Sequence, residues 1–480
     1  MSQDPKPASR ADALILFGAT GDLAFKKIFP ALQSMAQLGQ LDMPVVVLTR
    51  EGRSKETMLA RARESVQTYG GGADDAALAV LGRHLQVVAG DYGDAATYRE
   101  LATALRDQVR PLFYLAIPPS AYAGVVAGLG AAGCVRGGRV LIEKPFGHDL
   151  ASARELDAAI RRVFDEAAIF RLDHYAGKRS VQNVALFRFA NAWVEEFWNR
   201  DVITSVKVTM AESFGVAGRG RFYEEAGAIR DVLQNHLLLV ASVLGMEPPA
   251  SADGEALRDA MVKAYQAMRP LTPADVVRGQ FRGYRAEAGV SPDSTVETYV
   301  AVRLFFDSPR WTGVPFFIRT GKSLAVTANE VVVEFRRPPH PLAGVGPTRL
   351  RFGLGPDHSI AVEAPVRRAT PGWALGTGEL RLDGGPAGDD EITGYRDLIH
   401  AAIEGITVAF TRGDGVEAQW RVVEPVLGNA TPVFPYEAGS WGPAEAARLT
   451  EAYGGWSNPG AHGVGSRDIL GPIDGQAAHG

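Results

Sequence analysis

ALILFGATGDLAFKK, residues 13–27, lies near the start of the chain and is its most informative segment for fold class. An apolar run leads directly into a turn that contains Gly18 and Gly21, and a helical pattern follows. Glycines between a strand and a helix let the backbone approach a pyrophosphate, which the free amides of the helix start attract. The same spacing also fits an ordinary strand–helix turn, so the surrounding pattern must decide between the two interpretations.

Short apolar runs alternate with amphipathic stretches through the first third of the chain. We expect strands at 13–19, 44–49, 85–90, 111–117, 139–145 and 167–172. Strands that alternate with helices indicate a parallel sheet with crossover helices, and burial of both sheet faces explains why the runs are almost continuously apolar. The sequence therefore predicts a Rossmann-like α/β dinucleotide-binding domain at residues 11–176.

The pattern changes after about residue 176. Alternation of apolar and polar residues predicts antiparallel strands with one exposed face at 203–213, 295–306, 314–320 and 329–337. Helices expected at about 226–245 and 391–404 would cover the other face of this sheet. We therefore expect a larger α+β domain at 177–480, with a broad, mainly antiparallel sheet. The Gly- and Pro-rich stretch 341–390 allows no prediction of its strand order, and the tail after about residue 457 is expected to be loosely ordered.

Composition excludes several classes of function. A formal net charge of -5 gives no sign of a nucleic-acid-binding face. Cys134 is the only cysteine, so we expect neither an intrachain disulfide nor a thiolate metal cluster, and no metal site is predicted. The sequence contains no apolar run of about 18 residues and its first residues are polar, which predicts a cytoplasmic protein without a membrane span.

The end of the second expected strand bears on the choice of cofactor. That strand ends at Thr49 and Arg50, and Arg53 follows closely. A guanidinium group suits the 2′-phosphate of NADP, whereas sites for NAD usually carry an acid there, and Glu51 is such an acid. A solvated charged turn is the alternative interpretation. We predict NADP as the cofactor, with NAD as the second choice.

Six motifs along the chain are informative as an ordered set. They are GATGDLAFKK (18–27), EKPFGHDL (143–150), RLDHYAGK (171–178), GAIRDVLQNHLL (227–238), FFIRTGK (316–322) and GSWGP (439–443). In this order and spacing they resemble the signatures of the glucose-6-phosphate dehydrogenase family, from about Leu14 to about Trp456. The resemblance implies NADP-dependent oxidation of D-glucose 6-phosphate at C1 to 6-phospho-D-glucono-1,5-lactone, the first step of the oxidative pentose phosphate pathway. It also implies a homodimer or homotetramer and a cis peptide bond before Pro145.

The resemblance also implies a role for each polar residue of the motifs. His236 would be the base that takes the C1 hydroxyl proton, oriented by Asp173, and a histidine suits this task because its unperturbed pKa of about 6.5 lies near working pH. The expected substrate contacts, beginning with the phosphate ligands, are His174, Tyr175, Lys178, Lys144, Glu212, Asp231 and Lys322. The expected cofactor contacts are Gly18, Thr20, Gly21, Asp22, Leu23, Arg50, Tyr114 and Lys144.

Three positions depart from the family pattern. Thr327 and Gly355 stand where the family usually has a basic residue and a glutamine near the sugar, which predicts weaker binding of glucose 6-phosphate or relaxed selection at a ring hydroxyl. Thr393 replaces an acidic residue and speaks against a second, regulatory NADP site. A paralogue that oxidises another hexose or hexose phosphate, and a non-catalytic regulatory homologue, are the alternative interpretations.

Overall fold

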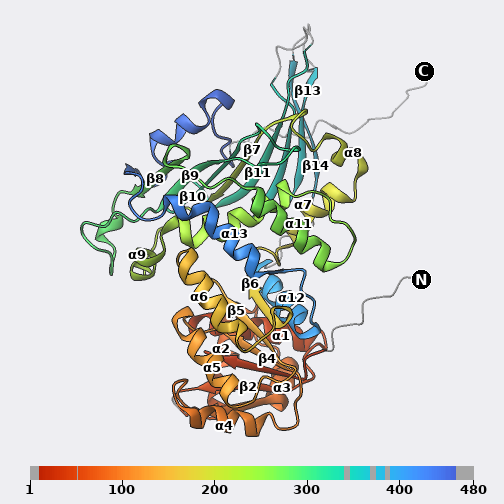
Figure 1. Cartoon of the computed structure of the whole chain (residues 1–480), viewed down its shortest axis with the longest axis vertical. Helices are drawn as coiled ribbons and strands as arrows, with labels where there is room; N and C mark the ends of the chain where they lie inside the picture. The colour runs from red at the N-terminus through yellow and green to blue at the C-terminus, as the bar shows by residue number, and fades with distance from the viewer. Residues whose placement is uncertain (1–9, 51, 340–345, 368–374, 384–389, 461–480) are drawn as a thin grey trace, which may run out of the picture.

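The computed structural model describes residues 10–50, 52–339, 346–367, 375–383 and 390–460, which form two regions that are each built on one sheet (Figure 1). Glu51 and most of the tail for which loose order was expected lie outside the described residues. Within this part of the chain, no helix combines the length and the apolar character that a membrane crossing requires.

The first sheet has the strand order β15-β6-β5-β4-β1-β2-β3 in the described residues. Its six parallel strands confirm all six predicted runs: β1 (Ala13–Phe17), β2 (Val45–Thr49), β3 (Leu85–Ala89), β4 (Pro111–Leu115), β5 (Arg139–Glu143) and β6 (Ile169–Leu172). The order reverses at β1, between β4 and β2, and ligands of such sheets bind beside this point at the carboxyl ends of the strands. The edge strand β15 (Phe410–Thr411) pairs antiparallel with β6 and was not predicted.

Helices cover both faces of this sheet because its strands are apolar on both sides. Alternate residues of β1 enter two different core clusters, Ile15 in one and Leu14 in the other. The covering helices are η1 (Ala24–Ile28), α1 (Phe29–Gln37), α2 (Lys55–Tyr69), α3 (Asp75–His84), α4 (Ala95–Ala104), α5 (Tyr122–Ala131) and α6 (Leu150–Arg161). Ser54, Asp74 and Asp94 accept amide hydrogen bonds at helix starts, which satisfies donors that a helix leaves open.

Helix α12 (Asp390–Glu404) corrects one prediction. It forms where a helix was expected, but it packs on the first sheet and not on the large antiparallel one (Figure 1). Its apolar residues Leu398, Ile399 and Ile403 join the core cluster that contains Leu32 and Met35 of α1. An amphipathic pattern shows that a helix has a buried face but not which surface it meets, and this explains the error.

The second sheet is mainly antiparallel, with the order β14-β13-β12-β11-β7-β10-β9-β8-β16. Predicted strands appear as β7 (Ile203–Ala211), β9 (Tyr299–Leu304), β10 (Phe316–Gly321) and β11 (Ala328–Phe335). Unpredicted strands are β8 (Val276–Phe281), β12 (Arg349–Gly355), β13 (Ile360–Arg367), β14 (Leu375–Leu382) and β16 (Val433–Tyr436). Two pairs, β7 with β10 and β8 with β16, are parallel. The first of these brings two strand ends together at the site described below.

The helix expected at 226–245 is divided into three parts. Helix α9 (Gly220–Ala228) breaks at Gly227, whose φ is 64°, then η4 (Ile229–Leu237) winds as a π-helix, and α10 (Leu238–Gly245) continues as an α-helix. The other helices of this region are α7 (Arg179–Phe189), α8 (Ala192–Phe197), α11 (Gly254–Ala267) and α13 (Gly413–Val423). Short helical turns are η2 (Pro119–Ala121), η3 (Glu166–Ala168), η5 (Pro273–Asp275), η6 (Tyr284–Ala286), η7 (Glu424–Val426), η8 (Ala444–Leu449) and η9 (Glu451–Tyr453).

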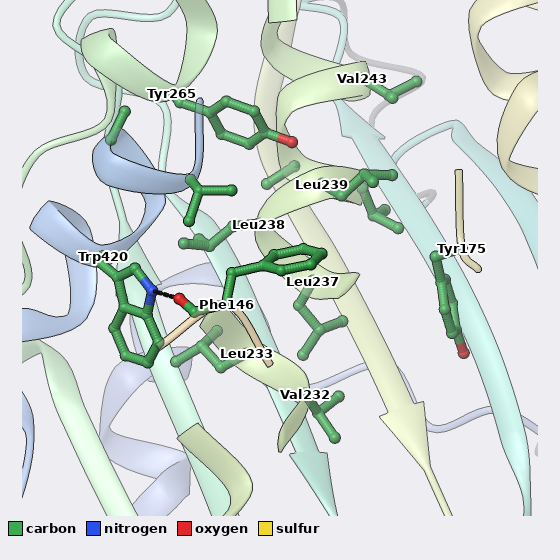
Figure 2. Packing of buried hydrophobic residues seen from close by; sticks show 14 of the residues in the cluster. Phe146, Tyr175, Val232, Leu233, Leu237, Leu238, Leu239, Val243, Tyr265 and Trp420 are labelled. Atoms are coloured by element: carbon green, nitrogen blue, oxygen red, sulfur yellow. Dashed lines mark hydrogen bonds between the residues drawn. The ribbon is translucent and has the colours of Figure 1, made fainter. Parts of the chain in front are cut away.

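The two regions share a buried seam around η4 and α13. Figure 2 shows Leu233 and Leu237 of η4 in one apolar cluster with Phe146 and Trp420. The indole Nε1 of Trp420 donates a hydrogen bond of 2.9 Å to the Phe146 carbonyl (Figure 2). Because Phe146 follows Lys144 by two residues, α13 helps to fix the loop that carries this lysine.

Candidate active site

Two polar residues of the site directly follow two neighbouring parallel strands. Lys144 follows β5 and Asp173 follows β6, and the register places Glu143 beside Leu172. Carboxyl ends of parallel strands meet at one edge of a sheet, so the motifs EKPFG and RLDHYAGK come together although they are far apart in sequence. The Lys144–Pro145 peptide bond is cis, as expected.

Asp173 and His236 form a buried hydrogen-bonded pair, as predicted. His236 Nδ1 lies 2.5 Å from Asp173 Oδ1, and the amide of Tyr175 donates to the same oxygen at 3.0 Å. With Nδ1–H donated to the carboxylate, Nε2 carries the free lone pair of the imidazole. The pair therefore has the arrangement of a base and the carboxylate that orients it.

The surroundings keep His236 neutral. Burial lowers its pKa well below 6.5, and the Lys144 and Lys178 ammonium groups lower it further, while Asp231 opposes them. Burial also raises the pKa of Asp173, although neighbouring cations counteract the rise. A neutral imidazole at working pH is the form that can accept a proton.

Aromatic rings connect the predicted phosphate ligands to His236. The Tyr175 ring stacks on the His236 imidazole with centroids 4.3 Å apart, and Lys178 Nζ lies 4.1 Å from the Tyr175 centroid. Asn329 Nδ2 donates to the Tyr175 hydroxyl at 3.3 Å, and that hydroxyl is 3.4 Å from Met210 Sδ. Asn329 and Met210 were not predicted, because both lie on strands of the second sheet with no motif to mark them.

His174 completes this group. Its ring centroid lies 4.5 Å from that of His236, and burial lowers the pKa of His174 well below 6.5. The Tyr395 ring of α12 lies nearly parallel to the His174 ring, with centroids 6.2 Å apart. Asp173, His174 and His236 have ligand-type atoms within 4.8 Å of one another, but the Asp173–His236 hydrogen bond already uses one such atom of each partner.

A second set of charges lies beside the pair. Lys144 Nζ donates to the Asp231 carbonyl at 2.7 Å and to its carboxylate at 3.2 Å. Burial alone would raise the pKa of Asp231, but the Lys144 and Lys322 ammonium groups lower it to about 2. Lys322 is in an ion pair with Glu212, and these residues follow the parallel strands β10 and β7. The predicted sugar-binding residues therefore converge from both sheets.

The predicted nucleotide turn is restricted to glycine at its first position. Gly18 has a φ of 81°, and a Cβ atom there would lie 2.1 Å from the Ala116 carbonyl oxygen. The Gly21 amide closes the turn by donating to the Gly18 carbonyl at 2.9 Å. Thr20, Asp22 and Leu23 lie in the same turn and at the start of the helical segment, so the predicted contacts share one edge of the sheet.

Arg50 lies at this edge beside two residues that were not predicted. Its side chain is 63% exposed, with Nε 3.6 Å from Asp91 Oδ2 and Cζ 5.1 Å from the Tyr92 ring centroid. The Tyr92 hydroxyl accepts a hydrogen bond of 2.9 Å from the Gly18 amide, and Tyr92 thereby links Arg50 to the glycine turn. The order of β1, β2 and β3 would have been needed to find Tyr92 from the sequence.

The structure places Tyr114, a predicted cofactor contact, on β4 of the first sheet. Its side chain is fully buried in the core, and its hydroxyl donates to Glu143 Oε1 at 2.6 Å. The Tyr114 ring belongs to the core cluster that contains Leu14 and Leu16, and a contact of Tyr114 with the cofactor stays a prediction. The Glu143 carboxylate that Tyr114 binds is itself unusual, because burial raises its pKa to about 7.

Two family models match consecutive parts of the chain. The model described as glucose-6-phosphate dehydrogenase, NAD binding domain, matches residues 15–183, and the corresponding C-terminal domain matches residues 185–457. The chain belongs to the glucose-6-phosphate dehydrogenase family. Membership makes it an oxidoreductase with a domain for a nicotinamide dinucleotide, in agreement with the sequence motifs.

Individual relatives match over almost the whole chain. Glucose-6-phosphate 1-dehydrogenase 1 of Mycobacterium tuberculosis (strain CDC 1551 / Oshkosh) is 39% identical, covering 94% of this chain and 97% of the relative. The crystal structure of glucose-6-phosphate 1-dehydrogenase from Mycobacterium avium is 38% identical, with a TM-score of 0.89 over 94% of this chain and 99% of that one. A glucose-6-phosphate dehydrogenase in complex with its substrate glucose-6-phosphate is 31% identical, with a TM-score of 0.86 and the same coverage.

Proposed function

We propose that this chain oxidises glucose 6-phosphate at C1 to the 6-phospho-lactone with NADP as the acceptor. The single observation that carries the proposal is the buried Asp173–His236 pair in contact with the Tyr175 ring, over which Lys178 lies. A base, an orienting carboxylate and a phosphate-binding lysine are the groups that this reaction needs. The relatives named above support the choice of substrate.

Two groups of side chains bind the two parts of the substrate, its phosphate and its sugar ring. Lys178, His174 and Tyr175 bind the phosphate of the substrate, the lysine as a point charge and the other two as hydrogen-bond donors. Lys144, Glu212, Asp231 and Lys322 hold the sugar hydroxyl groups.

The base stands at the centre of this arrangement. His236 Nε2 takes the proton of the C1 hydroxyl, and Asp173 stabilises the imidazolium that forms. NADP, when bound, supplies the nicotinamide ring that accepts the hydride from C1.

The residues at the nucleotide edge fit a phosphorylated dinucleotide. Glycine is required at position 18, because a Cβ atom there would collide with the Ala116 carbonyl oxygen. The largely exposed Arg50 guanidinium lies at the same edge of the sheet. Planar guanidinium groups bind phosphate through paired hydrogen bonds. Asp91 pairs with Arg50, and Glu51 follows it in sequence, so NAD remains the second choice.

Substrate selectivity depends on the two departures from the family pattern. The Thr327 hydroxyl is engaged with Ser213, whose amide donates to it at 3.0 Å. Among the described residues, a Cβ atom added at Gly355 would have Asn329 Nδ2 and His358 Cε1 near it, at 3.6 and 3.9 Å. Losing a hydrogen bond to a charged group costs about 1.5–3 kcal/mol, or roughly 10–150-fold in affinity, unless such neighbours or water replace it.

The decisive test is a comparison of turnover among related sugars, followed through the absorbance of the reduced nicotinamide. We expect glucose 6-phosphate to be oxidised, with weaker binding than in a typical family member. Better turnover of galactose or mannose 6-phosphate would favour the paralogue with another substrate. Better turnover of unphosphorylated glucose would contradict the phosphate assignment, and the absence of turnover with every sugar would favour a non-catalytic homologue.

The assembly that the proposed function implies is a homodimer through the large sheet. Leu380 and Leu382 support it, because both are exposed and lie two residues apart on β14, an edge strand of that sheet among the described residues. Residues two apart on a strand share one face, and natural edge strands seldom leave such apolar pairs uncovered. Light scattering should give a dimer mass for the wild-type chain and a monomer mass for the Leu380→Lys, Leu382→Lys double variant.

A further inference from the structure

A cavity of about 290 Å³ lies between α7, α10, α11 and the segment 408–412, apart from the polar residues of the proposed active site. Its walls are mostly apolar, and they include Val181, Leu239, Val243, Met261 and Phe410. Phe410 belongs to the first sheet, whereas the helices belong to the second region, so the cavity lies at the seam between them. Small-molecule sites favour such seams, with apolar walls and a few polar groups.

Two buried hydrogen-bond donors in this wall lack a partner within the described chain. They are the hydroxyl of Tyr265, which is 1% exposed, and Nε of Arg258, which is 5% exposed. Burial raises the pKa of the Tyr265 phenol, and the Ser242 and Gln419 side chains lie close enough to oppose this rise in part, but neither has the geometry of a hydrogen bond to the hydroxyl. Buried polar groups are normally paired, so two open donors indicate a missing acceptor.

The charges around the cavity determine what kind of acceptor fits. The Arg258 guanidinium already pairs with Glu255, and the Arg412 guanidinium pairs with both Asp259 and Asp414. Three carboxylates therefore balance two guanidinium groups. An anionic ligand would gain little attraction there, whereas a neutral oxygen could accept a hydrogen bond without a charge penalty.

We propose that this cavity binds a small, neutral and largely apolar molecule with one acceptor oxygen, and that its occupation acts on the sugar-phosphate residues. The wall residue Ala176 directly follows Tyr175 in sequence. Lys178 is the N-cap residue of α7, and Val181 and Ala185 of that helix line the cavity. A ligand that packs against these residues would therefore alter the position of Tyr175 and Lys178.

Three matched probes test the binding by calorimetry: benzylacetone, which has a neutral carbonyl, phenylbutyrate, which has a carboxylate, and butylbenzene, which has neither. We expect saturable binding of benzylacetone and clearly weaker binding of phenylbutyrate. Tyr265→Phe should weaken benzylacetone by about 2–12-fold, the value of one neutral hydrogen bond, without weakening butylbenzene. Absence of saturable benzylacetone binding to the wild-type chain would overturn the proposal.

Filling the cavity provides the control. Met261→Trp should abolish benzylacetone binding, whereas Met261→Leu should retain it. Ala409→Trp fills the cavity from the opposite wall and serves if the first variant does not fold. Continued binding to a folded, filled variant would place the ligand elsewhere and refute the site.

The action on the sugar-phosphate residues rests on the proposed function and has its own readout. Benzylacetone should change the KM for glucose 6-phosphate over the concentration range in which it binds, and Met261→Trp should remove this change. Saturable binding with an unchanged KM would refute the coupling alone. Failure of the proposed function would appear as no turnover in the absence of any probe, a result that leaves the binding data unaffected.

Discussion

The two ends of the proposed active site are built in opposite ways. At the catalytic end, Asp173 and His236 are buried, hydrogen-bonded and held by the Tyr175 ring and amide. At the nucleotide end, Arg50 is 63% exposed and its partner Asp91 is 62% exposed. The geometry of the first end is fixed before a substrate arrives, whereas the second end relies on a fixed glycine turn and on exposed side chains that solvent surrounds.

This contrast separates two kinds of consequence. Buried groups with defined partners determine whether the reaction proceeds, because small displacements of a base cost large factors in rate. Exposed charges contribute less to stability and more to the choice between ligands that differ in charge. Variants at the two ends should therefore differ in which kinetic constant they change as well as in the size of the effect.

The largest effect is expected at the catalytic base. His236→Asn retains an amide that can donate to Asp173 but cannot accept the C1 hydroxyl proton. Turnover should fall by about 10²–10⁴-fold, while the KM for the sugar changes little. Steady-state kinetics measures both, and a variant with half of the wild-type turnover would disprove the assignment of the base.

A matched substitution at Asp173 tests the orienting carboxylate. Asp173→Asn keeps the size of the side chain but removes the charge that stabilises the imidazolium, so turnover should fall while the fold is retained. Unchanged turnover in a folded Asp173→Asn variant would show that the 2.5 Å hydrogen bond to His236 has a structural role alone.

The next effect concerns the exposed end. Arg50→Ala removes a guanidinium group that would pair with the 2′-phosphate of NADP. The KM for NADP should rise by roughly 10–150-fold, the value of a charge-assisted hydrogen bond, and the KM for NAD should stay nearly constant. Equal changes for both cofactors would contradict this role of Arg50 and favour the solvated-turn interpretation.

The sequence predicted the strands that carry the active-site motifs more completely than it predicted the other strands. Continuous apolar runs located all six parallel strands, because strands buried on both faces have few polar residues. The strands β12, β13 and β14 were missed in a Gly- and Pro-rich stretch, and β15 is only two residues long. The partner surface of α12 was wrongly predicted, since the periodicity of a helix shows which of its faces is buried but not which sheet that face meets.

The same limit applied at the site. Motif residues such as His236 and Lys144 were predicted because their local sequence is distinctive. Asn329 and Tyr92 were missed because each meets its partner only through strand order, Asn329 at Tyr175 and Tyr92 at Gly18. The hydrogen bond of the Tyr114 hydroxyl to Glu143 was also missed, because it joins two neighbouring strands of the first sheet.

A smaller effect should separate stacking from hydrogen bonding at Tyr175. Tyr175→Phe keeps the ring on the His236 imidazole and removes the hydroxyl that Asn329 Nδ2 binds. It should raise the KM for the sugar phosphate with turnover nearly retained. Tyr175→Leu removes the ring as well, and turnover should then fall by about 2–12-fold, since an aromatic pair contributes roughly 0.5–1.5 kcal/mol. Identical kinetics in the two variants would show that the stack does not position the base.

The smallest expected effect is a shift in the pKa of His236. This shift would connect phosphate binding at Lys178 with proton uptake by His236. In the free protein, burial, Lys144 and Lys178 all lower the pKa of His236, so the ring should remain neutral to below pH 6.5. A lowered pKa disfavours the protonated form, and a sugar phosphate bound at Lys178 would supply negative charge that offsets this cation. Saturating glucose 6-phosphate without the dinucleotide should therefore raise the pKa of His236, by about one unit or less at such separations.

Nitrogen NMR of the imidazole measures the shift directly and avoids the titration of the phosphate itself, with His236→Asn identifying the signal. A pKa above 6.5 in the free protein would contradict the buried neutral base, and an unchanged pKa on binding would mean that the phosphate does not bind beside Lys178.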